Sequence, residues 1–154
     1  MADSIIMRRG THGDEEWLFQ LFRQTMQDYI DRAWGWQELL QREGFVTSLP
    51  SAGFQILEVN STPAGSFHLT DKKDHLELDM LLVEPPQQRR GYGTLMINQA
   101  KDHARQSQKP IMLSVLKSNP ALQFHLNSGF IQTAADEHSV RMCWQQAQSS
   151  TSEQ

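Results

Sequence analysis

The segment Val83–Thr94 combines two closely spaced glycines with two consecutive arginines. Gly91 and Gly93 allow open φ angles and let a ligand approach the backbone closely. A helix is expected to begin here, so its unpaired N–H groups and the positive end of its dipole would point to the same place. Arg89 and Arg90 add positive charge. Together these features predict a binding site for phosphate or pyrophosphate.

The spacing of these glycines excludes one common phosphate-binding motif and argues against another. The segment lacks the G-x-x-x-x-G-K-[ST] pattern of nucleoside triphosphatases. It also lacks the first glycine of the G-x-G-x-x-G dinucleotide fingerprint, and the strands before it look antiparallel. Taken by itself, the segment has an alternative interpretation as a glycine-rich turn with two solvated arginines.

The strand before this segment is expected to present two carboxylates on one face. Polar and apolar residues alternate in it, with Leu76, Leu78, Met80 and Leu82 on one face and His75, Glu77, Asp79 and Leu81 on the other. Strict alternation predicts a strand that is buried on one side only.

Two blocks of the sequence resemble a known family. Gln88-Arg89-Arg90-Gly91-Tyr92-Gly93 is similar to the Q/R-x-x-G-x-G/A signature of the GNAT superfamily of N-acetyltransferases, and Val83-x-Pro85 precedes it as is common there. The second block resembles the family's N-P-A-x-x-L-Y-x-x-x-G-F pattern and consists of Asn119-Pro120-Ala121, Phe124-His125 and Gly129-Phe130. At this separation the two blocks resemble a complete GNAT domain over about residues 4–144.

The resemblance implies that the chain binds acetyl-coenzyme A. Backbone N–H groups of the signature loop would hold the pyrophosphate, at Gln88, Arg89, Arg90, Gly91, Gly93 and Thr94. Position 89 is commonly glycine in relatives, so Arg89 is a departure from the pattern. Backbone groups of Leu81, Leu82 and Val83 would pair with the pantetheine arm and polarise the acetyl carbonyl, which stabilises the oxyanion that develops there. Asn119 would contact the cofactor, and Tyr92 would pack inward.

The resemblance also implies proton transfers. An amine of lysine type has a pKa of about 10.4, and a carboxylate acting directly or through water could take its proton. Glu77 lies where some relatives have a catalytic glutamate, and Asp79 is the second candidate; the alternative is that both belong to the wet face of an ordinary strand. His125 replaces the tyrosine that commonly protonates the departing thiolate, and histidine is competent near neutral pH. A helix residue without a chemical role is the alternative for His125, and Tyr29 is another candidate donor.

The acceptor cleft is expected between the first two helices, because this region lines it in the superfamily. Tyr29, Trp34 and Trp36 are the candidate acceptor-binding residues. The alternative is that both tryptophans close the helix junction over the core. The acceptor half carries many acidic residues, which predicts a cationic acceptor, either a small polyamine-like or antibiotic-like amine or a protein amino group.

A mixed framework is needed to position these residues. Periodicity predicts strands at about 4–9, 54–59, 64–70, 75–82, 110–116, 130–134 and 139–144. It predicts helices at about 14–31, 36–48, 93–104 and 119–128, and a turn at 60–63. This order favours an α/β (α+β) domain over residues 1–144, and the GNAT resemblance implies a mixed, mostly antiparallel sheet of about seven strands with about four helices. Residues 145–154 are polar and are predicted to be a disordered tail.

Composition limits the classes of function. The 154 residues carry 14 Lys and Arg against 18 Asp and Glu, a net charge of −4, which argues against nucleic-acid binding. The longest apolar run, Met80–Val83, is far shorter than the roughly 20 residues that span a bilayer. A single cysteine and histidines without ligand spacing predict no disulfide and no metal. The N-terminus lacks a secretory signal, so a cytoplasmic location is expected.

The predicted function is therefore N-acetyl transfer to a primary amine by direct attack in a ternary complex. A non-catalytic sensor of coenzyme A is one alternative, suggested by the departure at His125. A non-enzymatic anion-binding domain is the other. Many relatives are homodimers, but no residue of this chain decides its oligomeric state.

Overall fold

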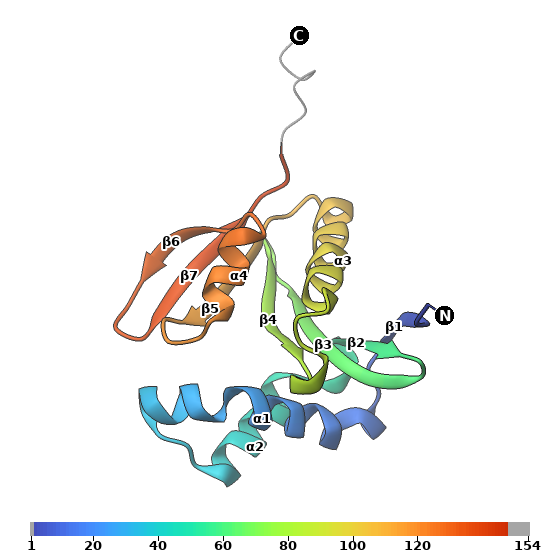
Figure 1. The fold of residues 1–154 in the computed structure, drawn as a ribbon. Coiled ribbons are helices and arrows are strands. Elements are labelled where there is room, and N and C mark those ends of the chain that lie inside the picture. Colours follow the sequence, from blue (N-terminus) through green and yellow to red (C-terminus); the bar gives the residue numbers. More distant parts are fainter. Residues whose placement is uncertain (1, 148–154) are drawn as a thin grey trace.

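A computed structural model describes residues 2–147, and Figure 1 shows the fold. The strands are β1 (Ile5–Arg9), β2 (Phe54–Val59), β3 (Thr62–Asp71), β4 (Leu76–Val83), β5 (Ile111–Leu116), β6 (Ile131–Ala135) and β7 (Ser139–Trp144). The α-helices are α1 (Glu15–Trp34), α2 (Glu38–Ser48), α3 (Tyr92–Ser107) and α4 (Ala121–Asn127). Short 3-10 turns are η1 (His12–Asp14), η2 (Ser51–Gly53) and η3 (Pro85–Gln87). Residues 148–154 of the predicted tail lie outside the described residues.

The seven strands form one sheet in the order β1-β2-β3-β4-β5-β7-β6, which confirms the predicted mixed α/β class. Neighbouring strands are antiparallel except for β4 and β5. The parallel pairing of β4 with β5 comprises Leu76 opposite Ile111 and Glu77 opposite Met112. Beyond these two pairs the strands diverge toward α1 (Figure 1). This divergence makes room for a site in the middle of the sheet.

Helices cover both faces of the sheet. The core beneath α3 and α4 gathers apolar side chains from β2 to β7, and Met96, Ala100 and Ala104 of α3 are buried in it. The core on the other face joins α1 and α2 to the sheet, largely through the aromatic rings of Phe19, Phe22, Phe45 and Phe54. In the part of the chain that the structure describes, no helix is both long and apolar enough to cross a membrane.

A β-bulge in β4 contradicts the predicted strict alternation of this strand. The register pairs Leu69 with Leu78 and His68 with Met80, so Asp79 is the extra residue. Apolar side chains before the bulge pack beneath α3, whereas those at the even positions after it pack against α1 and α2. The bulge therefore exchanges the two faces of the strand halfway along it.

The β2–β3 hairpin is tighter than predicted. Asn60 and Ser61 have positive φ angles of 53° and 69°, and β3 begins at the next residue. Two consecutive residues of positive φ match the twist of an antiparallel pair, which is why short hairpins favour this turn. The expected four-residue turn is thus a two-residue turn.

Candidate functional site

Two adjoining cavities occupy the place where β4 and β5 diverge. The larger, of about 560 Å³, lies between α1, the end of β4, the loop before α3 and the start of α4. The smaller, of about 240 Å³, lies between α1, β4 and β5. Met26, Leu81, Leu82, Asn119 and Ala121 line both cavities. A ligand extended through the larger cavity would therefore present its end to the smaller one.

The predicted glycine-rich loop lines the larger cavity. Gly91 has a φ of 84° and precedes the first residue of α3, and a Cβ built there would meet no atom within 4 Å. No side chain caps this end of the 16-residue helix. Its first N–H groups therefore lack intrahelical acceptors, and the helix dipole is positive here. This is the geometry of an anion-binding site.

The other residues of the loop differ from the simple prediction. Arg89 adopts a φ of 64°, a region that favours glycine, and its side chain lines the larger cavity, whereas that of Arg90 does not. Gly93 does not have a positive φ. A Cβ at Gly93 would lie 3.3 Å from Cζ of Phe124, so this glycine lets α4 pack closely against the start of α3. Tyr92 is buried, as expected.

The end of β4 forms another wall of the larger cavity. Leu81, Leu82 and Val83 line it, beyond the point where the pairing with β5 ends. The edge of β4 that faces away from β3 therefore carries backbone groups that can pair with an extended ligand. Gln88 Nε2 donates a hydrogen bond to the Val83 carbonyl at 3.1 Å, which ties the loop to the strand.

Glu77 lies on the face that was predicted for both carboxylates, but it is engaged by other side chains. The guanidinium of Arg141 donates hydrogen bonds of 2.6 and 2.8 Å to its two oxygens, and His75 Nε2 lies 2.9 Å from Oε1. Burial by itself raises the pKa of Glu77, but the hydrogen bonds from Arg141 and His75 outweigh it and hold this pKa below its usual value. The side chain lines neither cavity.

Asp79 lies on the same face and lines the smaller cavity. Its Oδ2 atom accepts a hydrogen bond from Thr70 Oγ1 at 2.7 Å and lies 2.8 Å from His68 Nδ1. An ionised carboxylate only accepts, so Nδ1 of the buried His68 carries the proton. The local sequence around His68 does not reveal this contact, because the bulge in β4 decides which residue His68 meets and no local pattern indicates that bulge.

The two candidate proton donors lie in different cavities. His125 lines the smaller cavity and is 7% exposed; its burial lowers the pKa to about 4, so the ring is neutral at neutral pH. Its Nδ1 atom is buried without a hydrogen-bond partner among the described residues. Tyr29 lines the larger cavity.

Asn119 lies where the two cavities meet. Its Oδ1 accepts a hydrogen bond of 2.9 Å from the Ala121 backbone N–H at the start of α4. Its Nδ2 lies 3.6 Å from the sulfur of Met26 on α1. The side chain thus helps to join α1 and α4 at the predicted cofactor site.

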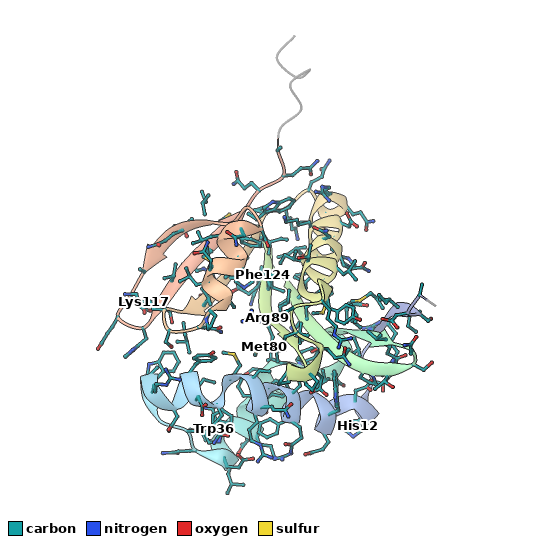
Figure 2. All side chains as sticks on the ribbon, in the orientation of Figure 1. His12, Trp36, Met80, Arg89, Lys117 and Phe124 are labelled. Atoms are coloured by element: carbon teal, nitrogen blue, oxygen red, sulfur yellow. The ribbon has the colours of Figure 1, made fainter. Side chains whose placement is uncertain are left out.

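Trp34 and Trp36 have different surroundings. Trp34, at the end of α1, is 62% exposed and lines the smaller cavity. Trp36 packs on Phe22 with ring centroids 5.7 Å apart and lines neither cavity. Figure 2 shows Trp36 at the connection between α1 and α2. The alternative that the tryptophans close the helix junction over the core therefore holds for Trp36 but not for Trp34. Within the described residues, no group of three or more His, Cys, Asp or Glu side chains could hold a metal ion.

Known proteins resemble the chain in sequence pattern and in fold. The sequence profile of the acetyltransferase (GNAT) family matches residues 15–130. No curated protein sequence matches the chain. PaiA N-acetyltransferase of Thermoplasma acidophilum, solved in complex with coenzyme A, superposes with a TM-score of 0.77 at 17% identity, over 93% of this chain and 99% of that one.

Two further solved structures share the fold. The ribosomal-protein-S18-alanine N-acetyltransferase of Escherichia coli has a TM-score of 0.73 at 16% identity, over 96% of this chain and 98% of that chain. The N-acetylglutamate synthase of Neisseria gonorrhoeae, with coenzyme A and N-acetyl-glutamate, has a TM-score of 0.72 at 18% identity. This last match covers 94% of the present chain and 35% of the synthase. Identities this low concern the fold alone.

Proposed function

The chain belongs to the acetyltransferase (GNAT) family, and from this premise we propose that it transfers the acetyl group of acetyl-coenzyme A to a primary amine by direct attack in a ternary complex. The family by itself implies an acyltransferase. The observation that carries the finer proposal is the pair of adjoining cavities, one with an anion-binding helix end and one with a carboxylate. The acceptor is a small cationic molecule or a protein amino group.

The larger cavity fits the coenzyme. When bound, acetyl-coenzyme A supplies an acetyl thioester. We assign its pyrophosphate to the start of α3, where backbone N–H groups from Gly91 to Thr94, the helix dipole and the Arg89 side chain favour negative charge. Gln88 and Arg90 flank this place. The free edge of β4 would pair with the pantetheine arm and polarise the acetyl carbonyl.

Asp79 is the proposed base, in preference to Glu77. Asp79 faces the smaller cavity, whereas Arg141 and His75 occupy the oxygens of Glu77. The amine loses its proton to Asp79, directly or through water, and its nitrogen then forms a bond to the acetyl carbon while the carbon–sulfur bond breaks.

Tyr29 is the proposed donor of the proton that the departing thiolate needs. Its side chain lines the larger cavity, which is assigned to the coenzyme. Burial lowers the pKa of His125 to about 4, so the ring is neutral at neutral pH, and we therefore assign His125 to the wall of the acceptor cavity.

The first test is a calorimetric titration of the full chain with acetyl-coenzyme A. Gly91→Leu should abolish binding, because it places a side chain in the open loop and strains a positive φ. Gly35→Leu is the matched control, because Gly35 also has a positive φ and open space and does not line the larger cavity. Absence of binding to the unaltered chain at millimolar ligand would remove the proposal. Binding without thiol release in the presence of amines would favour the non-catalytic sensor.

A further inference from the structure

The walls of the smaller cavity are mostly apolar, and the polar residues that line it besides Asp79 are Ser114, Asn119, His125 and Ser139. The apolar residues include Phe22, Met26, Ile30, Met80, Leu113 and Val115, which come from α1, β4 and β5. Among the described residues that line the cavity, Asp79 is the one acidic side chain, and burial keeps His125 neutral at neutral pH. The cavity thus presents a single carboxylate in a mostly apolar surrounding.

That charge is held in a fixed position. Thr70 and His68 both bond to Oδ2 of Asp79, and the His68 ring is itself 3% exposed and packs edge-on against Phe54 at a centroid distance of 4.7 Å. The rotation of the carboxylate is therefore limited, while Oδ1 makes neither of these two bonds. A cation entering the cavity would find one carboxylate oxygen for a charge-assisted hydrogen bond.

These features select among cationic amines. One ammonium group can pair with Asp79, but a second ammonium within the apolar walls would be buried without a counter-charge. A peptide amine brings amide groups, for which the side chains of Ser114, Asn119, His125 and Ser139 are the polar partners that line the cavity. An apolar body, by contrast, is favoured in this cavity, because its burial removes apolar surface from water.

The volume sets the size of the acceptor. The cavity has a volume of about 240 Å³. It is smaller than the ~300–1,000 Å³ typical of pockets for drug-sized ligands. The bulk of an antibiotic or a folded protein would therefore have to remain outside.

From this combination we infer that the acceptor is a small monoamine with an apolar alkyl or aryl body, whose ammonium group pairs with Asp79. This inference rests on the proposed function, because it names the acceptor class of the same site. It sets aside the polyamine and the protein amino group that the acidic composition had suggested.

The test compares phenethylamine and hexylamine with putrescine, spermidine and a short alanyl peptide. Binding of each amine is measured by calorimetry on the complex of the full chain with coenzyme A, and turnover is measured separately by thiol release. The apolar monoamines should bind and react at least about tenfold better than the others, and Asp79→Asn should weaken their binding by a similar factor. Equal or better binding of putrescine, spermidine or the peptide would overturn the inference.

The two measurements keep the two proposals apart. Selective binding of monoamines without turnover would support the acceptor class and contradict the acetyl transfer. Turnover that prefers polyamines or peptides would support the acetyl transfer and contradict the acceptor class.

A second variant changes the lining of the smaller cavity and leaves Asp79 unaltered. Trp34→Glu adds a carboxylate at an exposed position of the cavity lining and should raise the preference for putrescine over hexylamine by roughly tenfold. Ile131→Glu is the matched control, because Ile131 is 66% exposed on β6 and lines neither cavity. An unchanged preference in Trp34→Glu would show that the charge of the cavity does not select the acceptor.

Discussion

Asp79 and Glu77 are two carboxylates two residues apart on one face of β4, and their neighbours give them different chemistry. Asp79 faces a cavity with one oxygen free of the His68 and Thr70 bonds, whereas both Glu77 oxygens accept hydrogen bonds from Arg141. Residue type and spacing alone left both as candidate bases. The two carboxylates are distinguished by their hydrogen-bond partners.

Replacement of Asp79 should lower kcat/KM far more than replacement of Glu77. We expect Asp79→Asn to lower kcat/KM by roughly hundredfold or more, because the acceptor loses its base. Glu77→Gln should keep kcat/KM within about threefold, because Glu77 does not face the acceptor cavity. Thiol release at saturating acetyl-coenzyme A measures both. Equal losses in the two variants would contradict the assignment.

The buried His125 should make the free energy of unfolding depend on pH. Burial lowers the pKa of His125 to about 4 from a reference of 6.5, so the unfolded chain binds more protons between these two values. Stability therefore falls as pH drops through this window, by up to about 3 kcal/mol at ~1.4 kcal/mol per pKa unit. Denaturant unfolding of His125→Phe at several pH values should show a flatter profile. His12→Gln, at a side chain that is 92% exposed, is the control and should keep the original slope.

At the scale of elements, the site depends on the divergence of β4 from β5. Arg141 on β7 reaches across β5 to Glu77, and it also lies 3.1 Å from the hydroxyl of Ser114 on β5. The ion pair therefore ties three strands together at the last paired residues before they separate. This places Glu77 and Arg141 in the framework of the site.

A double-mutant cycle tests this framework role. Glu77→Gln and Arg141→Gln should each lower the free energy of unfolding by about 1–3 kcal/mol, less than for a fully buried pair because both side chains are partly exposed. The double variant should cost less than the sum of the two by roughly 1 kcal/mol. The exposed pair Asp102 and Arg105 is the control, and its coupling should be near zero. Additive losses of unfolding free energy at Glu77 and Arg141 would contradict the proposed coupling between these two residues.

At the scale of the molecule, the coenzyme would be held by separate parts of the chain. The larger cavity is lined by α1, β4, the loop before α3, and α4, so a ligand there contacts both cores. Because such a ligand binds the folded state alone, its binding free energy adds to the stability of the whole fold.

Acetyl-coenzyme A should therefore raise the unfolding free energy. At a ligand concentration of about one hundred times Kd the expected gain is roughly 2.7 kcal/mol, measured by denaturant unfolding. The gain should vanish in Gly91→Leu at the same ligand concentration and persist in Gly35→Leu. A gain that survives in Gly91→Leu would locate the coenzyme elsewhere.

The order of the elements and the position of the proposed anion site could be predicted from the sequence. Periodicity and turn residues are local signals, so strands, helices and the loop from Gln88 to Gly93 could be recognised without tertiary contacts. The boundaries shifted by a few residues, and the β2–β3 turn was tighter, because backbone φ angles at Asn60 and Ser61 are not encoded in periodicity.

Tertiary contacts were needed to show which carboxylate lines the smaller cavity, which we propose holds the acceptor. The bulge at Asp79 depends on the register between β3 and β4, and the partner of Glu77 lies 64 residues away along the chain. The two faces of β4, the burial that lowers the pKa of His125 and the separation of Trp34 from Trp36 likewise follow from packing between distant segments. Pairing free energies across strands depend on neighbours that a local pattern does not contain, and those neighbours set the chemistry of the site.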